Sequence, residues 1–383
     1  MRQLIAVLVV ALVALTTASA DEIGIRIGDV PRTGSHFANA RSAALCGASA
    51  ATGGLTSVHH NPAAIGRIQG AEGFASLRIN MTSRDYLPDG DASLEATDDG
   101  LLLAEAAAVK TTDIWTFGFA YATPAYRSLE LVGDVETGER PLEAYDGEFT
   151  ASFRTFEAVL ATKIGKRGQG IVGFSAGIAT INETGRVVIG PDLEESWEID
   201  GISPCYSIGF LFAPVDRVAV GIGYRFSSEI DVEGTGRGLE GEKGTFSTAP
   251  IATGGVTFVP MDGLALHASV IRESWHQAEA ELDDPGAVEV LRSPNLGDPI
   301  LTVAFGAEYD VTESIALRAG YSIQTADGFE STAVPENAFG VGATYSFSEY
   351  FVDASYVYES FEVDGESGDM TTGALHVAFG YEF

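Results

Sequence analysis

The side chains that could carry acid–base or metal chemistry in this chain are six scattered histidines. They are His36, His59, His60, His267, His276 and His376. Nucleophilic catalysis needs a serine or cysteine beside a base that a third group orients, and no nucleophile motif accompanies any of these histidines. His59 and His60 are adjacent, so on an extended segment their side chains point apart, and no further ligand cluster is visible. The sequence therefore predicts no enzyme, no metal site and no cofactor.

Arginines are the second group of side chains with a chemical role. Arg154, Arg225 and Arg318 lie on segments whose residues alternate between large apolar and small or polar. On inward-facing positions they could meet a carboxylate ligand. They could equally pair with acids such as Glu157 or Glu308 and so satisfy a buried charge. We favour the second interpretation, and both stay open at this point.

Strands must position these residues, and the end of the chain shows the pattern most clearly. In residues 372–383 every second side chain is apolar, from Leu375 to Phe383, and residues 115–121 alternate aromatic with small or polar side chains in the same way. Successive side chains of a strand point to opposite faces, so these strands have one wholly apolar face. An apolar strand with a free edge recruits other chains, whereas a closed barrel has no edge. A final strand of a soluble sandwich is the alternative reading of this segment alone.

About fourteen such segments follow one another from residue 70 to residue 383. The connections between them are alternately short and long, and we expect long loops near residues 83–99, 124–147 and 183–196, among others. An even number of strands, with short turns on one side and long loops on the other, is the signature of a bacterial outer-membrane barrel. The sequence therefore predicts an all-β fold, a transmembrane antiparallel β-barrel of about fourteen strands with a small and polar face toward the lumen.

The N-terminal part of the chain does not read as strands. Arg2, an apolar run over residues 4–15 and Ala18-Ser19-Ala20 match a secretory signal peptide, predicted over residues 1–20. Residues 21–69 contain an alanine-rich stretch and the turn signal Asn61-Pro62. A barrel of this strand number leaves a channel unless something fills it. We therefore expect residues 21–69 to form a hatch that plugs the lumen of a barrel spanning residues 70–383.

Charge and cysteine content limit the partners. The net charge of −32, from 54 acidic and 22 basic residues, excludes a nucleic-acid partner because nothing could neutralise phosphates. We expect the acidic loops to be solvated surface; divalent ions that bridge them to lipopolysaccharide stay an open alternative. Cys46 and Cys205 are too few for a disulfide scaffold, which leaves one bridge or two unpaired thiols.

The hatch motif and the order of the strand motifs resemble one known family. Asn61-Pro62-Ala63-Ala64 is similar to the asparagine-proline-alanine signature of the hatch in the FadL/TodX outer-membrane transporters of hydrophobic compounds. The segments 207–226, 250–275, 305–309, 317–321, 334–337 and 339–347 follow in that family's order. The resemblance covers about 300 residues. The chain departs from the family at its expected mature N-terminus, Asp21-Glu22-Ile23-Gly24, and in the second alanine of the hatch signature.

The resemblance implies passive uptake of long-chain fatty acids or aromatic hydrocarbons. Such solutes would be captured by the extracellular loops and released sideways through the barrel wall beside the third strand. In that strand Gly118 and Pro124 could interrupt the hydrogen-bond ladder, because glycine weakens a strand and proline cannot donate to it. The alternative is that Gly118 merely admits hatch side chains and Pro124 ends the strand.

Two other functions remain possible for such a barrel, a structural or secretion-associated role without a small-molecule ligand, and a nonspecific porin. In either case we expect a monomer in the bacterial outer membrane. Its partners would be outer-membrane lipid and lipopolysaccharide, and the barrel assembly machinery acting through the C-terminal residue Phe383. The identity of the hydrophobic substrate does not follow from the residues.

Overall fold

The computed structural model describes residues 39–86, 93–98, 101–135, 143–165, 169–189, 193–236, 242–274, 280–282, 299–325, 335–361 and 370–382. The expected signal peptide, the first part of the expected hatch and Phe383 lie outside these residues. No helix in the described part of the chain is both long and apolar enough to cross a membrane.

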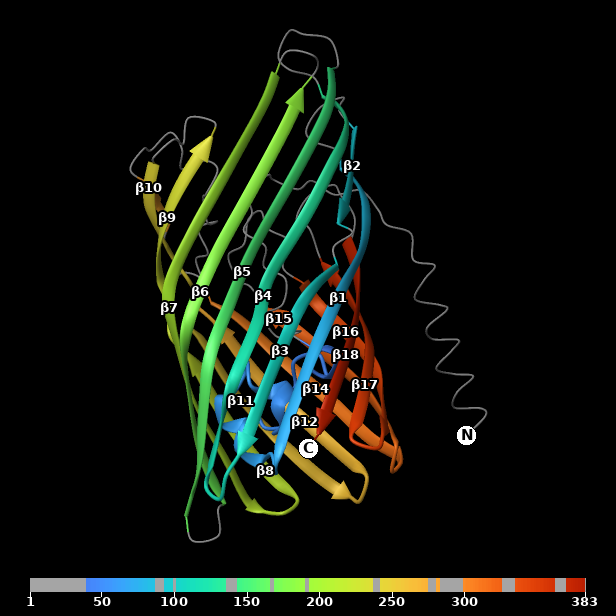
Figure 1. Cartoon of the computed structure of the whole chain (residues 1–383). Coiled ribbons are helices and arrows are strands. Elements are labelled where there is room, and N and C mark those ends of the chain that lie inside the picture. Colours follow the sequence, from blue (N-terminus) through green and yellow to red (C-terminus); the bar gives the residue numbers. More distant parts are fainter. Residues whose placement is uncertain are drawn as a thin grey trace, which may run out of the picture.

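The described strands form one closed antiparallel barrel of 14 strands. It closes where β18, the last strand, pairs with β1, the first, from Glu72 opposite Glu382 to Met81 opposite Gly373 (Figure 1). Four of the 14 strands are each broken into two segments, so the sheet has 18 segments in all. The segments are β1 (Ala71–Tyr86), β2 (Ser93–Asp98), β3 (Leu101–Thr111), β4 (Trp115–Val135), β5 (Glu143–Ile164), β6 (Gly170–Ile189), β7 (Leu193–Val215), β8 (Val218–Arg225), β9 (Glu229–Gly236), β10 (Glu242–Ser247), β11 (Ile251–Met261), β12 (Leu264–Glu273), β13 (Ala280–Leu282), β14 (Ile300–Thr312), β15 (Ile315–Thr325), β16 (Pro335–Phe347), β17 (Tyr350–Phe361) and β18 (Met370–Glu382).

The alternation read from the sequence corresponds to the two faces of the wall. On β4, Phe117 and Phe119 are 48% and 74% exposed, whereas Thr116 beside them is 1% exposed. Large apolar side chains therefore cover the outer surface, and small or polar side chains face the lumen, as hydrocarbon outside the barrel requires. The all-β barrel of about fourteen strands is confirmed.

The strands β4 to β7 are longer than the sequence indicated. They have 21, 22, 20 and 23 residues, whereas β14 to β18 have 11 to 13, so that one side of the barrel is much taller (Figure 1). At about 3.3 Å per residue, 21 residues span about 70 Å, well beyond a hydrocarbon core of about 30 Å. The loops expected near 124–147 and 183–196 are therefore mostly strand. Beyond the hydrocarbon core neither face of a strand has to be apolar, so the apolar alternation can end while the ladder continues.

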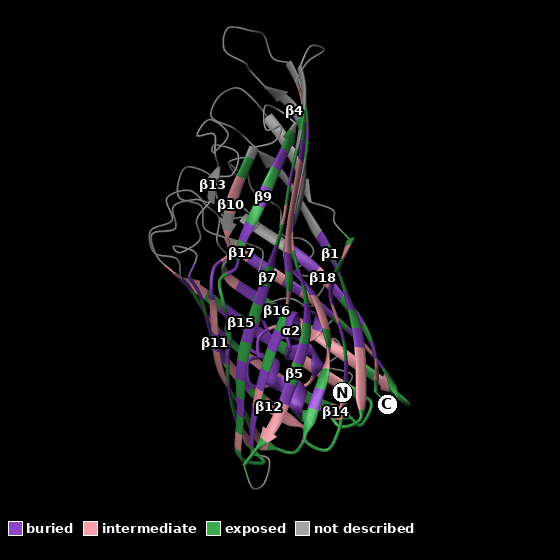
Figure 2. Cartoon of the chain, turned by 60° about the vertical axis from the view of Figure 1, so that its left-hand side comes forward, coloured by how far each residue is buried: buried purple, intermediate pink, exposed green. Residues whose placement is uncertain are grey.

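Residues 39–70 lie inside the barrel. The segment contains the helix α2 (Ala40–Ala44) and the 3-10 helices η1 (Leu55–Ser57) and η2 (Pro62–Arg67). α2 contacts β15 to β18 and η2 contacts β4 to β7, so the segment reaches from one side of the lumen to another (Figure 2). Asn39 caps α2 by accepting a hydrogen bond from the Ser42 backbone N–H, and the Ser42 hydroxyl reciprocates in a capping box.

Glycines on the lumen face admit the backbone of this segment. A Cβ on Gly173 of β6 would overlap the backbone of Pro62 and Ala63, and a Cβ on Gly340 of β16 would overlap the carbonyl oxygen of Ala43. The small face of the strands is thus matched to the main chain of residues 39–70. Packing at this density leaves no room for a larger side chain.

We expect Gly173→Val to displace η2 from the wall, because the new side chain overlaps backbone atoms rather than the end of a flexible side chain. Overpacking of this kind typically costs about 1–3 kcal/mol. Limited trypsin digestion of the folded barrel should then cut after Arg67 sooner than in the wild type. Gly254→Val is the matched control, since a Cβ on Gly254 of β11 would meet nothing within 4 Å. Equal digestion of the two variants would contradict the packing argument.

Candidate functional site

The four residues of the hatch motif lie in the lumen against β6 and β7. The Asn61 side chain donates hydrogen bonds to the backbone oxygens of Ala50 at 3.0 Å and Phe210 at 3.1 Å, and accepts one from the Ala63 backbone N–H at 3.0 Å. Pro62 occupies the first turn of η2, where its missing N–H is not needed. Ala63 and Ala64 are 0% exposed. The motif therefore joins two parts of the hatch to the barrel wall through one asparagine.

Arg225 lies in the lumen at the centre of a buried polar cluster. Its guanidinium is 2.7 Å from a Glu157 carboxylate oxygen and 3.3 Å from Nδ1 of His59, a hatch residue. Glu157 also accepts a hydrogen bond from the Ser175 hydroxyl, which in turn contacts Ser207. The charge is thus paired within the wall, and the hatch contacts the pair through an imidazole.

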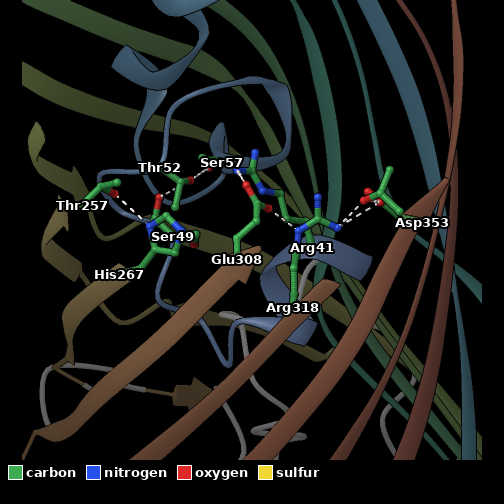
Figure 3. A network of polar contacts seen from close by, with 10 residues as sticks. Arg41, Ser49, Thr52, Ser57, Thr257, His267, Glu308, Arg318 and Asp353 are labelled. Carbon is green, nitrogen blue, oxygen red and sulfur yellow. Dashed lines mark hydrogen bonds and ion pairs between the residues drawn. The ribbon is translucent and has the colours of Figure 1, made fainter. Parts of the chain in front are cut away.

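Arg318 belongs to a second network on the other side of the lumen. It pairs with Glu308 and with Asp353, and the hatch residue Arg41 contacts the same Glu308 at 3.0 Å (Figure 3). Thr344 joins the network through Arg318 and Asp353. Two arginines and two carboxylates balance each other here, so each charge has a partner when it leaves water.

A polar cavity of about 670 Å³ opens beside this second network, at the end of the barrel with the short turns. Arg41 and Leu55 of the hatch lie on its wall, and Asp310, Glu313 and Glu382 come from the strand ends around it. The hatch therefore bounds this cavity.

Arg154 does not share the lumen position expected of it. It is exposed and lies on the same face of β5 as Phe156 and Leu160, the outer face, whereas Glu157 lies on the lumen face. Arg154 and Glu157 are separated by an odd number of positions, so on a regular strand their side chains point to opposite faces. The expectation that Arg154 faces inward is thus not met, and Arg225 and Arg318 are the two arginines of that set in the lumen.

The ladder of the barrel wall is interrupted between β4 and its neighbours β2 and β3. β4 pairs with β3 up to Ala122, opposite Glu105, and with β2 from Glu130, opposite Thr97. Within the described residues, the β4 stretch 123–126 has no ladder partner on this side, and residues 99 and 100 of the facing strand lie outside the described part of the chain. A side-chain bond from the Thr123 hydroxyl to the Leu103 carbonyl oxygen, 2.9 Å long, reaches across. We call this stretch the wall gap.

A second break, between β7 and the pair β8 and β9, differs from the wall gap. Its ladder has no pair between Ser207 opposite Arg225 and Ile202 opposite Asp231, and the Phe226 N–H donates to the Tyr206 carbonyl oxygen at 3.0 Å. A backbone hydrogen bond therefore bridges this second break, whereas a side-chain bond reaches across the wall gap.

Gly118 and Pro124, the two residues expected to weaken the third strand, behave differently. Gly118 pairs regularly with Val109 and Val159, and a Cβ on it would overlap the backbone of β3. Pro124 lies in the wall gap, where the register of β4 against β5 also shifts between Ala122 and Ala125. β4 nevertheless continues to Val135, so Pro124 interrupts the ladder without ending the strand.

Sequence reasoning missed Arg41 and Glu105. Arg41 lies in an alanine-rich stretch that showed no site, and its carboxylate partner is 267 positions away. Glu105 is buried between alanines, and a hatch residue, Asn39, donates to it at 2.5 Å. An acid within an otherwise small and apolar strand was the available signal for Glu105. Cys46 and Cys205 are both buried and unbridged.

Comparisons with known proteins agree with this architecture. A family model described as outer membrane protein transport protein (OMPP1/FadL/TodX) matches residues 32–366. The Pseudomonas putida toluene transporter TodX has a similar structure, with a TM-score of 0.69 at 13% identity over 93% of this chain and 99% of that one. A Pseudomonas aeruginosa FadL homologue gives 0.66 at 16% identity over 94% and 100%. The Ralstonia pickettii toluene transporter TbuX gives 0.60 at 13% over 89% and 98%. No curated protein sequence matches the chain.

We expect Asn61→Ala to loosen the hatch, because the substitution removes the donor to two backbone oxygens, those of Ala50 and Phe210. Leaving a buried acceptor unsatisfied costs about 1–3 kcal/mol. Hydrogen–deuterium exchange of the hatch amides should become faster by a matching factor. Asn182→Ala is the control, since Asn182 lies on the exposed part of β6 and donates its hydrogen bond to Asp200 of the neighbouring β7. Unchanged hatch exchange in the Asn61 variant would contradict the assigned role.

Docking of the hatch should also depend on pH through His59. Burial, and then the charges of Arg225 and His60, hold the pKa of His59 well below its usual value. A free histidine titrates near pH 6.5, so below that pH the undocked hatch binds a proton that the docked hatch does not. Docking therefore weakens as the pH falls through about 6.5. Amide exchange of the hatch, corrected for the intrinsic rate, should accelerate between pH 7 and pH 5, and His59→Gln should flatten this dependence. An equally steep dependence in that variant would rule His59 out.

Proposed function

Because the chain belongs to the OMPP1/FadL/TodX family of outer membrane transport proteins, we propose that it takes up hydrophobic compounds passively and releases them sideways through its wall. Long-chain fatty acids and aromatic hydrocarbons are the substrate classes we propose. Two of the proteins with similar structures, TodX and TbuX, are toluene transporters. The protein itself is a β-barrel of the outer membrane.

The wall gap is the observation that supports lateral release. A solute that leaves the lumen through a wall facing hydrocarbon never has to enter the aqueous periplasm. Each methylene group that stays out of water saves about 0.8 kcal/mol, so a twelve-carbon chain gains several kcal/mol over a watery route. A break in the ladder at Pro124, flanked by outward-facing Leu101 and Leu103, offers such an exit.

The hatch supports a transporter over a nonspecific porin. An open porin needs a continuous aqueous lumen. Here residues 39–70 pack against both sides of the lumen with Leu45, Leu55 and Ile65 fully buried. A structural or secretion-associated barrel without a ligand is the alternative. Such a barrel would have no use for the wall gap.

The remaining parts of the assignment belong to the same proposal. Residues 1–20 act as a cleaved signal peptide, residues 21–69 as the hatch, and residues 70–383 as the membrane barrel. The protein works as a monomer among outer-membrane lipid and lipopolysaccharide, without catalysis. Phe383 is the residue we propose for recognition by the barrel assembly machinery, following a strand whose outer face carries Phe379, 52% exposed.

Deleting Ala104 of β3 together with Pro124 of β4 tests lateral release. β3 has one extra residue at Ala104 against β1, and β4 has one extra residue between Ala122 and Ala125 against β5, so removing one residue from each strand restores regular alternation and lets the ladder between them continue. Uptake of a labelled hydrophobic solute should fall to the level of cells that lack the protein, while the barrel still shows the heat-dependent shift in gel mobility of a folded barrel. Deleting Asp134 and Val135 at the outer end of β4 is the matched control and should leave uptake intact. Normal uptake after the first deletion would rule out this exit.

A further inference from the structure

Two buried side chains at the inner end of the wall gap have polar atoms without a partner. Glu105 on β3 and Ser76 on β1 are both 0% exposed. Within the described part of the chain, Oε1 of Glu105 and the hydroxyl oxygen of Ser76 make no hydrogen bond. Burying such atoms unsatisfied costs free energy, so a native protein usually retains them for a reason.

Their place in the wall connects them to the gap. Glu105 forms the last pair with β4, opposite Ala122, before the ladder stops, and Ser76 lies directly opposite Glu105 on the other neighbouring strand. Ala104 is the extra residue of a β-bulge at this point, since Ser76 pairs with Glu105 but Leu77 pairs with Leu103. The bulge lets Glu105 point to the lumen while Leu103, 41% exposed, points outward.

A side chain of the hatch, that of Asn39, reaches this place. The amide nitrogen of Asn39 donates to Oε2 of Glu105 at 2.5 Å and to the carbonyl oxygen of Thr56 at 2.7 Å. Asn39 is also the N-cap of α2, whose five residues make it a short helix. The first turn of α2 is thus hydrogen-bonded to Glu105, which forms the last ladder pair before the wall gap.

We propose that Glu105 and Ser76 bind the hydroxyl group of an amphipathic solute, such as a long-chain alcohol or an alkylphenol, as it passes toward the wall gap. The inference rests on the proposed function. The solute O–H donates to Oε1 of the Glu105 carboxyl group, and its oxygen accepts from the Ser76 hydroxyl. Asn39 keeps its hydrogen bond to Oε2, so the solute hydroxyl meets the oxygen of Glu105 that has no partner.

This geometry distinguishes three kinds of solute. A hydroxyl group both donates and accepts, so it satisfies both unpartnered atoms. An alkane offers neither function and leaves them buried and unsatisfied. An ionised carboxylate has no proton to donate to Oε1, and moving its charge into a place with 0% exposure costs free energy.

Binding of three labelled twelve-carbon solutes to the purified mature protein in detergent tests the inference. The solutes are 1-dodecanol, dodecane and dodecanoate. In the wild type 1-dodecanol should bind most tightly. Ser76→Ala should weaken 1-dodecanol about 2- to 10-fold, the range for one hydrogen bond, and leave dodecane unchanged. Glu105→Gln keeps the shape and replaces an acceptor oxygen by an NH₂ donor, so it should strengthen dodecanoate, which can only accept, relative to 1-dodecanol.

Thr302→Val on β14 is the matched control, because its hydroxyl is also 0% exposed and without a partner but lies away from the gap. It should change none of the three affinities. If the wild type binds dodecane and 1-dodecanol equally, or if Ser76→Ala and Glu105→Gln shift all three solutes together, the hydroxyl site is wrong while transport of hydrophobic compounds stands. If the wild type binds none of the three, the proposed function itself fails.

Discussion

The structure depends on the requirement that backbone polar groups in hydrocarbon find partners within the protein. A barrel meets it by closing, and here β18 returns to β1 so that the wall has no open edge. Closure imposes two faces on every strand, one toward lipid and one toward the lumen. Closure of this many strands also creates an interior that would be an open channel if nothing occupied it, and residues 39–70 occupy it.

The interior is filled mainly by backbone and small side chains. Glycines such as Gly173 and Gly340 let the main chain of the hatch approach the wall. The Asn61 side chain donates hydrogen bonds to one carbonyl group of the hatch and one of the wall. Two arginines of the lumen are paired with carboxylates, Arg225 with Glu157 on one side and Arg318 with Glu308 on the other. The hatch contacts both pairs, through His59 at Arg225 and through Arg41 at Glu308. Docking of the hatch and the charge balance of the lumen are therefore coupled.

The wall gap is the place where the closure requirement is relaxed. Pro124 cannot donate to a ladder, and the bulge at Ala104 shifts the register on the facing strand, so that both sides of the gap deviate from regular pairing. Asn39 connects the hatch to the last regular rung through Glu105. The hatch in the lumen and the break in the wall are therefore connected through the hydrogen bond between Asn39 and Glu105.

The residues by themselves determined the barrel, the approximate strand number and the hatch motif. These are local matters, because the face of Phe117 against that of Thr116 follows from a period of two along one strand. The face of Arg154, the length of β4 beyond Pro124 and the partners of Glu105 needed the tertiary structure. Each depends on register between strands, where one bulge or one odd spacing reverses a side chain, and on contacts with a hatch far away along the chain.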